Sequence, residues 1–437
     1  MIYVFSINVV WYTSYTAPLL ALSARICRGE VFLDESYSIY VDVIEHNSNY
    51  LFAGPIGLPL LISIPACIAG IGGNQLLVGG IVVSILGLIS TILTYALTRL
   101  YSERYALASA LIASLGGILW IYSSHIFPQA PLTFSMLLTI YLGILVIRRG
   151  VVKRYIYLLL GLSSSIALLM DPMALLASLS ICAVIAIYIA RSLGVRAFLQ
   201  GAVLWLAGFM PLAMVQMLYN LAAVGDPLSF PETLLLRKIG VDGFLGISVN
   251  PIYGLYMLII DPRKGLIPLY PVLGVGLVML PRFLSSIRSR YERAIFTIYL
   301  ASYAIPHSMW YDFDGGLSYG PRFLVPITPI LALPIQLLLI GWPRGRALVP
   351  ALSIFSISTN SMVVTITPYP CALEDMAFPS NQFISCVLPR LLEGIRAGYL
   401  YEILRTQIGD LFSVLGSVLI LSLSSTALIL YTVRKKI

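Results

Sequence analysis

Long apolar stretches recur along the whole of this 437-residue chain, and they constrain its fold more than any other feature. Most have about the length that a helix needs to cross the hydrocarbon core of a bilayer. They are apolar throughout rather than at alternate positions, which argues against a transmembrane β-barrel. The expected spans lie at roughly 2–23, 76–98, 105–121, 131–148, 155–170, 173–190, 197–219, 266–281, 294–307, 322–341, 347–367 and 411–432.

These stretches predict an all-α, polytopic transmembrane protein with about 12 spans (range 10–13), forming a single integral membrane domain over residues 1–437. Hydrophobic residues make up 59% of the chain, far more than in a soluble protein. The lipid bilayer is therefore an expected partner. The net charge of +8 agrees with arginines at cytoplasmic helix ends and does not indicate a nucleic-acid partner.

Basic residues indicate the orientation of the chain in the membrane. They cluster in short segments between the expected spans, at 148–154, 191–196 and 282–293, and cytoplasmic segments carry such an excess. This orientation puts both termini in the cytoplasm of a multi-pass cell-membrane protein. It leaves only Glu103 and Glu292 of the 19 acidic residues inside. The outer loops are then expected at about 24–75, 220–265, 308–321 and 368–410.

One further apolar stretch, at 56–72, begins and ends on the outer side in this arrangement, so it cannot be a full span. It is also rich in proline and glycine. We expect it to form a juxtamembrane or re-entrant helix in the first outer loop.

An acidic pair, Asp34-Glu35, follows the first apolar stretch and has mostly apolar neighbours. Charged side chains near lipid are costly, so their presence points to a function. A carboxylate at the outer interface can deprotonate an acceptor hydroxyl or coordinate a divalent cation such as Mg²⁺ or Mn²⁺. The alternative is an ordinary solvated loop with helix-capping acids.

The acidic pair is followed by Tyr37 and then by a Gly/Pro-rich turn at 54–59 that leads into a leucine-rich helix. This order resembles the GT-C superfamily of membrane glycosyltransferases. More narrowly, it resembles the branch of protein O-mannosyltransferases and lipid A aminoarabinose transferases. Further stretches are similar to that branch in the same order, up to about residue 345: 122–131, 219–228, 263–271 and, within 315–324, Tyr319-Gly320-Pro321-Arg322.

Two stretches depart from the patterns of such enzymes. Gln129 stands where many relatives carry an acid, which puts a role for that position in doubt. The run Trp310 to Gly315 is faintly similar to the tryptophan-aspartate signature of oligosaccharyltransferase subunits, but its spacing and its place in the chain differ. We assign neither stretch a role.

The resemblance implies transfer of a sugar from a polyprenyl-phosphate (dolichyl-type) carrier to a hydroxyl-bearing acceptor on the outer face. It implies Asp34 as general base, with Glu35 beside it. Arg263, Lys264 and Arg322 would bind the donor phosphate, since positive charge stabilises the departing anion. For these three cations, snorkelling at a helix start and interfacial lipid binding stay open.

Three more residues are expected to line the cavity of such an enzyme: His125, Tyr319 and Asp171. Other roles stay open for them, namely interfacial hydrogen bonding for His125, membership of an aromatic belt for Tyr319 and helix capping for Asp171. The sequence does not identify the donor sugar or whether the acceptor is a protein, a lipid or a glycan.

The five cysteines do not form an evident framework. Cys67 and Cys182 lie in apolar stretches and are expected to be small buried side chains, whereas Cys27 follows the first stretch. Cys371 and Cys386 share one polar loop and can form a disulfide if that loop faces an oxidising exterior.

Two other classes of protein remain as alternatives. One is a polytopic transporter or lipid-linked-sugar flippase without transferase activity, and the other is a non-catalytic membrane scaffold. The halves of the chain show no repeat, and ionisable residues are nearly absent from the span centres, which disfavours an alternating-access pathway. The acidic outer loops favour an active site at the surface.

Overall fold

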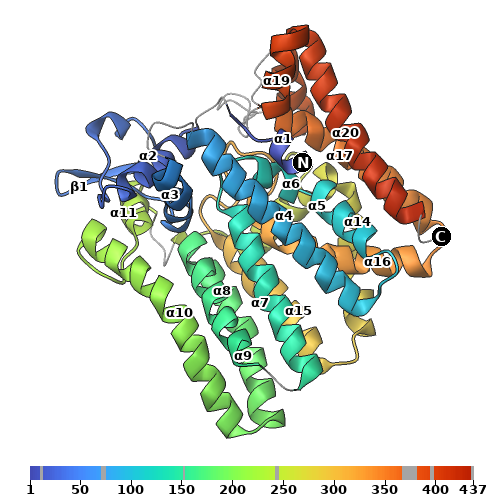
Figure 1. Ribbon diagram of the computed structural model, residues 1–437, viewed down its shortest axis with the longest axis horizontal. Coiled ribbons are helices and arrows are strands. Elements are labelled where there is room, and N and C mark those ends of the chain that lie inside the picture. Colours follow the sequence, from blue (N-terminus) through green and yellow to red (C-terminus); the bar gives the residue numbers. More distant parts are fainter. Residues whose placement is uncertain are drawn as a thin grey trace.

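The structure, a computed structural model, describes residues 1–9, 13–69, 75–150, 153–241, 246–366, 381–393 and 398–434. Within these ranges, seven helical segments are long and apolar enough to cross a membrane (Figure 1). They are α4 (Gln75–Tyr101), α7 (Gln129–Arg149), α9 (Ala174–Ser192), α10 (Val195–Val224), η3 (Arg322–Leu331) joined to α16 (Ala332–Gly341), α17 (Gly345–Thr365) and most of α20 (Asp410–Arg434).

Shorter or more charged helices correspond to the other expected spans. These are α5 (Ala106–Leu115) with α6 (Leu119–Ser124), α8 (Arg154–Met170), α13 (Leu266–Leu269) with α14 (Pro271–Ser286), and α15 (Arg290–Met309). Small helices cap the bundle: α11 (Pro231–Lys238), α12 (Pro251–Ile259), η5 (Phe383–Val387), α18 (Leu388–Glu393) and α19 (Tyr399–Ile408). The expectation of a polytopic all-α membrane protein is confirmed.

The expected first span, 2–23, is wrong as a continuous helix. The chain forms α1 (Ile2–Phe5), leaves the helix, and resumes as α2 (Thr16–Ile26). Distant partners take the backbone groups between them: the Asn8 N–H donates to the carbonyl of Ser124 (2.9 Å), and the Ile7 carbonyl accepts from the N–H of Tyr399 (2.8 Å). These bonds replace the helical ones.

The first loop contains a hairpin that was not predicted from the sequence. After η1 (Glu35–Tyr37), strands β1 (Val43–His46) and β2 (Asn49–Phe52) pair antiparallel, in the register Val43↔Phe52 to His46↔Asn49. Both residues of its two-residue turn have positive φ, as in a type I′ hairpin. The expected helix at 56–72 follows as α3 (Gly57–Ala69), which is too short to span.

A disulfide joins Cys27, at the end of α2, to Cys67 in α3. The expectation that Cys67 is a small buried thiol is therefore wrong, because the two helices pack together and bring the cysteines within bonding reach. Cys182 is a free thiol, partly buried. Cys371, whose pairing with Cys386 the sequence leaves open, lies outside the described residues.

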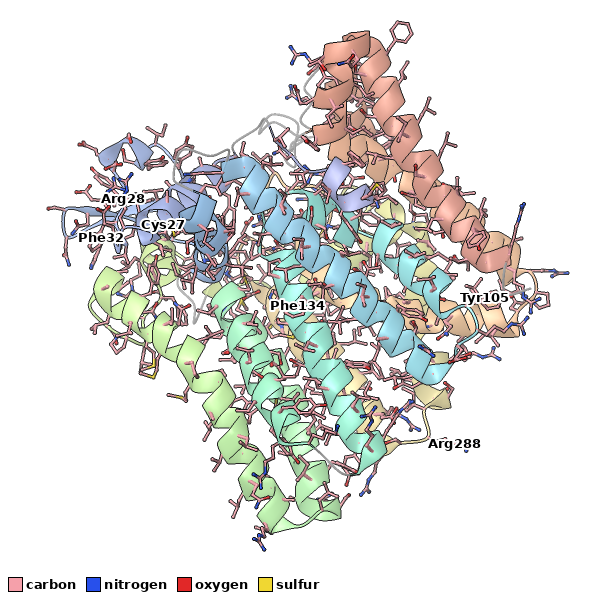
Figure 2. The ribbon with its side chains drawn as sticks, viewed as in Figure 1. Cys27, Arg28, Phe32, Tyr105, Phe134 and Arg288 are labelled. Carbon is pink, nitrogen blue, oxygen red and sulfur yellow. A yellow bond between two sulfur atoms is a disulfide. The ribbon has the colours of Figure 1, made fainter. Side chains whose placement is uncertain are left out.

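Figure 2 shows the first loop and the loop of Arg288 at opposite sides of the molecule. Residues of the first loop, such as Cys27 and Phe32, lie at one side of the molecule, and Arg288 lies at the other. On the Arg288 side, the Arg148 guanidinium forms a two-pronged ion pair with Glu292 (2.9 and 3.0 Å), which also accepts from the Tyr101 hydroxyl (2.8 Å). This cluster joins α4, α7 and α15.

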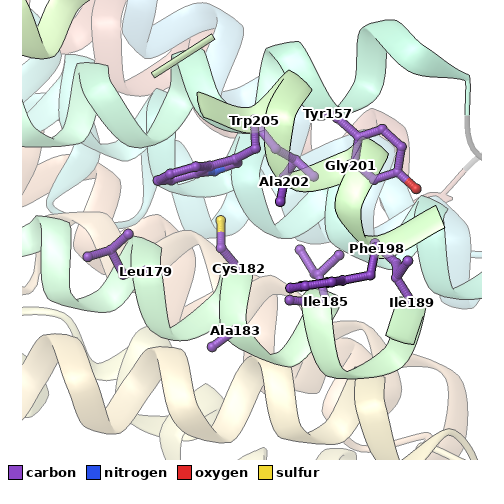
Figure 3. A pocket seen from close by; sticks show the side chains of 12 residues that line it. Tyr157, Leu179, Cys182, Ala183, Ile185, Ile189, Phe198, Gly201, Ala202 and Trp205 are labelled. Carbon is purple, nitrogen blue, oxygen red and sulfur yellow. The ribbon is translucent and has the colours of Figure 1, made fainter. Parts of the chain in front are cut away.

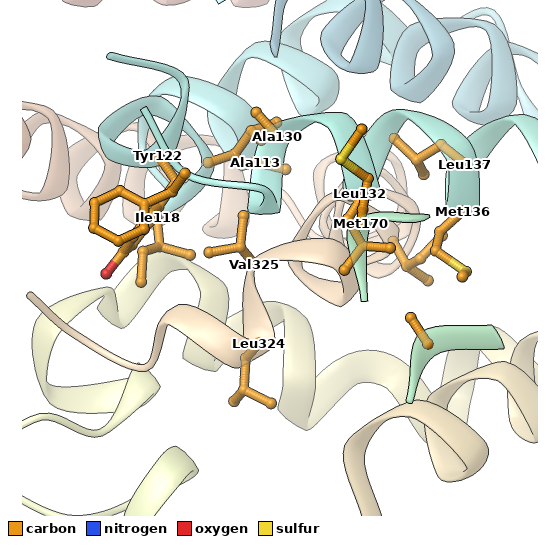
Figure 4. Close-up of a cluster of buried hydrophobic side chains, with 14 of the residues drawn as sticks. Ala113, Ile118, Tyr122, Ala130, Leu132, Met136, Leu137, Met170, Leu324 and Val325 are labelled. Carbon is orange, nitrogen blue, oxygen red and sulfur yellow. The ribbon is translucent and has the colours of Figure 1, made fainter. Parts of the chain in front are cut away.

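One cluster of the buried core lies between α5, α6, α7 and η3. Figure 4 shows its apolar side chains converging there, with Ala113, Ile118, Ala130 and Val325 among them, all fully buried. This packing fixes η3, and with it the loop that precedes η3.

Helices α8 and α10 approach each other through glycines. A Cβ added to Gly161 would overlap the carbonyl oxygen of Trp205, and one added to Gly208 would overlap that of Leu158. Small residues permit such close crossings in membranes.

We therefore expect Gly161→Ala to destabilise the protein by about 1–3 kcal/mol, because the added methyl must push α10 away. The measurement is thermal unfolding in detergent. Gly341→Ala is the matched control, since nothing lies within 4 Å of its new Cβ. Equal stability of the two variants would contradict the close crossing.

Candidate functional site

A cavity of about 430 Å³ opens at the end of the bundle where the predicted outer loops lie, within the usual range for ligand sites. Six segments far apart in sequence line it: the start of α2, the first loop with its hairpin, the start of α7, the α8–α9 turn, α11, and the stretch from His307 to Phe323. Five of the six belong to segments expected on the outer side or at outer helix ends. The exception is the start of α2, with Ser14 and Tyr15, which the sequence analysis placed inside the first span.

Charged groups gather on the wall of this cavity. Four carboxyl groups, Asp42, Asp171, Glu232 and Asp312, line it together with the guanidinium of Arg322. Acids therefore outnumber the arginine, and each is partly shielded from solvent. Charges this close together shift the pKa values of the neighbouring carboxyl groups.

Asp42 precedes β1 and is half-buried. Burial raises its pKa to about 6, with Asp312 contributing and Arg322 opposing. Burial raises the pKa of Glu232, in α11, to about 8, and repulsion from Asp171 and Asp42 adds to this. At neutral pH Asp42 is therefore mostly ionised, with a pKa close to the ambient pH, and Glu232 is mostly protonated.

Arg322 reaches the cavity from the start of η3. Its Nη2 lies 3.3 Å from Oδ2 of Asp312, and its guanidinium stacks on the ring of Phe323. The turn beneath it is tight: Gly315 has a φ of +75°, and a Cβ there would lie 2.8 Å from the Arg322 Nε. Glycine thus allows Arg322 to lie directly against the loop.

Two side chains from other segments hold this loop. The Lys264 ammonium donates to the carbonyl oxygens of Asp314 (2.7 Å) and Gly316 (2.5 Å). Gln382 accepts from the N–H of Gly320 (2.8 Å) and donates to the carbonyl of Ser318 (3.0 Å). The loop that carries Asp312 is therefore fixed from both sides.

His307 and Asp171 form a close pair at the cavity wall. His307 Nε2 lies 2.7 Å from Oδ2 of Asp171, and its Nδ1 lies 2.7 Å from the carbonyl oxygen of Tyr303. Both partners are acceptors unless Asp171 is protonated.

The structure separates the predicted catalytic pair from the cavity. Asp34 is 62% exposed and forms an ion pair with Arg25, which also binds Glu30. Glu35 is exposed as well, and neither residue lines the cavity. The first loop turns back on itself, and the acid it brings to the cavity is Asp42.

Of the predicted phosphate-binding residues, Arg322 lines the cavity. Lys264 is just behind the wall, and Arg263 pairs with Asp261 at 3.0 Å outside it. Burial lowers the pKa of Lys264 to about 8. Its contacts make it a support for the loop.

Of the predicted lining residues, Asp171 is in the wall. His125 and Tyr319 are fully buried and do not line the cavity. His125 contacts the carbonyl of Ile121 (2.8 Å), and the Tyr319 carbonyl accepts from the Tyr122 hydroxyl (2.9 Å). Both therefore belong to the core.

Glu232, Asp312 and His307 were not predicted as parts of one site. A signal existed for Asp312, in the Trp310 to Gly315 run that was set aside on spacing. Gln129, the departure from the expected acid, also lines the cavity. No sequence signal linked Glu232 to the others, since α11 meets them only through the fold.

The described residues contain no group of three or more His, Cys, Asp or Glu side chains arranged to hold a metal ion. The carboxyl groups of the cavity line its wall without converging on one point. A site for Mg²⁺ or Mn²⁺, which the sequence left open, therefore finds no fitting donor set among them.

We expect Gly315→Ala to destabilise the protein more than Gly29→Ala. The two glycines share nearly the same φ (+75° and +76°), but nothing lies within 4 Å of a Cβ at Gly29. Gly29→Ala measures backbone strain alone, on the order of 1 kcal/mol, and Gly315→Ala adds displacement of Arg322. Thermal unfolding compares the two, and equal shifts would mean that Arg322 does not rest on this turn.

No protein-family model matches this sequence, and no curated protein matches it. Solved structures do. A crystal structure of ArnT from Cupriavidus metallidurans in the apo state matches with a TM-score of 0.56 at 14% identity, over 99% of this chain and 74% of that one. Another, bound to undecaprenyl phosphate, matches with a TM-score of 0.49 at 14% identity, over 99% and 75%. This chain therefore has a polytopic helical fold of the GT-C type, like that of ArnT.

Proposed function

We propose that this protein is a membrane glycosyltransferase that moves a sugar from a polyprenyl-phosphate carrier to a hydroxyl-bearing acceptor at the outer face. The observation that carries the proposal is that Asp42 and Arg322 line the same cavity. One is a carboxylate with a pKa near 6, and the other is a guanidinium whose charge acts on it. The GT-C-type fold and the ordered motif resemblance support the same reaction class.

The chemistry needs a base and an anion-stabilising group. The Asp42 carboxylate takes the proton of the acceptor hydroxyl. At the same time the oxygen of that hydroxyl attacks the anomeric carbon of the sugar. The bond between that carbon and the phosphate oxygen breaks, and the departing polyprenyl phosphate keeps the electron pair. Arg322 stabilises this charge, because a guanidinium matches phosphate oxygens in geometry as well as charge.

The preference for Asp42 over Asp34 rests on surroundings. A base must lie within reach of the hydroxyl it deprotonates, and a raised pKa improves its proton-accepting power near neutral pH. Asp42 meets both requirements on the cavity wall. Asp34, implied by the resemblance, is paired with Arg25 in solvent.

Asp42→Asn should therefore lower kcat by at least about 100-fold, the usual contribution of a general base. Asp34→Asn, the matched change in the same loop, should stay within a few-fold of the wild type. The assay is sugar transfer by purified protein, with a panel of polyprenyl-phosphate sugars as donors and mixed glycans and lipids as acceptors.

The opposite ranking would assign the base to Asp34, and full activity of both variants would remove the catalytic role from this loop. If the wild type transfers no sugar from any donor while it moves the lipid-linked sugar across vesicles, the transporter alternative is correct.

The pH profile of kcat/KM should be bell-shaped. Asp42 must be ionised to act as a base, so activity should rise as the pH passes through about 6. Above about 8, Glu232 gains a negative charge and Lys264 loses a positive one, and both changes oppose an anionic substrate. Glu232→Gln should move the alkaline limb upward, whereas Glu45→Gln, an exposed change in the hairpin, should leave the profile unchanged.

A further inference from the structure

A second cavity, of about 270 Å³, lies between α8, α9 and α10 (Figure 3). Its walls are aromatic, formed by Tyr157, Phe198 and Trp205, and small residues such as Ala183 and Gly201 make room between them. The lining is almost entirely apolar and contains no charged side chain. It therefore suits a hydrocarbon chain rather than a polar ligand.

This cavity opens toward the lipid. Leu179 and Ala183 at its edge are exposed, and α10 is the least buried of the spanning helices in the described chain. Since the surrounding solvent at this depth is lipid, a hydrocarbon tail is what can enter. If the cavity were empty, the side chains that line it would lack dispersion contacts on one side.

Basic residues lie at the helix ends next to one end of the same cavity. Arg154 lies three residues before Tyr157, at the start of α8. Arg191 follows the lining residue Ile189 by two residues in α9. The other two basic residues of this stretch are Lys153 and Arg196, and all four are exposed.

The described parts of α8, α9 and α10 hold almost no acidic residues to balance this charge. Asp171 is the only acid between Lys153 and Gly225, and it lies at the opposite end of α8, on the wall of the first cavity. Positive charge at a cavity mouth beside the bilayer surface attracts anionic headgroups.

We infer that this cavity is a binding site for an anionic phospholipid of the leaflet on the basic side. One acyl chain occupies the space between Trp205 and Phe198, and the phosphate lies among Lys153, Arg154, Arg191 and Arg196. The inference is independent of the proposed transferase reaction, because it uses neither its cavity nor its residues.

The test follows the indole of Trp205. Wild-type protein and Trp205→Phe are reconstituted in phosphatidylcholine vesicles, and the difference between their fluorescence is the Trp205 signal. Lipids with brominated acyl chains quench an indole they touch. Dibrominated phosphatidylglycerol should reach half-quenching at a mole fraction at least about tenfold lower than dibrominated phosphatidylcholine, since several basic groups act on one headgroup.

Matched variants separate the two parts of the site. Arg191→Gln with Arg196→Gln should remove most of the preference for the anionic lipid. Arg282→Gln with Arg288→Gln, exposed arginines elsewhere on the same side, should retain it.

The acyl pocket has its own pair of variants. Ala183→Phe should abolish the preferential quenching by filling the cavity. Ala207→Phe, the same exposed substitution on α10 outside the lining, should not. Raising the salt to about 1 M should weaken the preference in the wild type without any substitution.

Equal quenching by the two brominated lipids would overturn the inference, because it would mean annular lipid contact only. A preference that survives both the arginine changes and high salt would overturn it as well.

Discussion

Backbone hydrogen bonding is the constraint on which the rest of this structure depends. Inside a bilayer an unpaired N–H or C=O is costly, so the chain can leave the helix only where another part of the protein supplies partners. Between α5 and α6, the Asn360 amide of α17 donates to the carbonyls of Leu115 (3.0 Å) and Gly117 (2.9 Å). The irregular loop before η3 is held in the same way by Lys264 and Gln382. The candidate site is built on such compensated breaks.

The length and apolar character of the helices made most of the bundle predictable. Local composition could not reveal the break between α1 and α2, because residues 2–23 read as one apolar run. The partner that stabilises the break, Tyr399, lies far along the chain. The hairpin at Asn47-Ser48 is local and was readable in principle, since β-branched and aromatic residues flank a short polar turn.

The candidate site was predictable in class but only partly in its residues. Charge segregation predicts which side is outer, and motif order points to Arg322 and the first loop, both of which contribute to the cavity wall. Motif order did not distinguish Asp34 from Asp42. Which of these two acids lines the cavity depends on how the loop turns back and on Arg25, which pairs with Asp34. The contribution of α11 and of the α8–α9 turn depends on tertiary packing that leaves no mark in the local sequence.

The Cys27–Cys67 bond gives the first loop a maturation step of its own. The cysteines are separated by 40 positions and enclose Asp42 and the hairpin, so the bond closes the segment into a covalent ring. Insertion of the helices needs no oxidant, whereas closure of the ring does. A chain can therefore be fully inserted while its first loop is still open, and the entropy cost of ordering that loop falls only once the ring forms. Assembly of the membrane bundle and completion of the cavity that the first loop lines are then separable events, and the second depends on the redox state of the compartment.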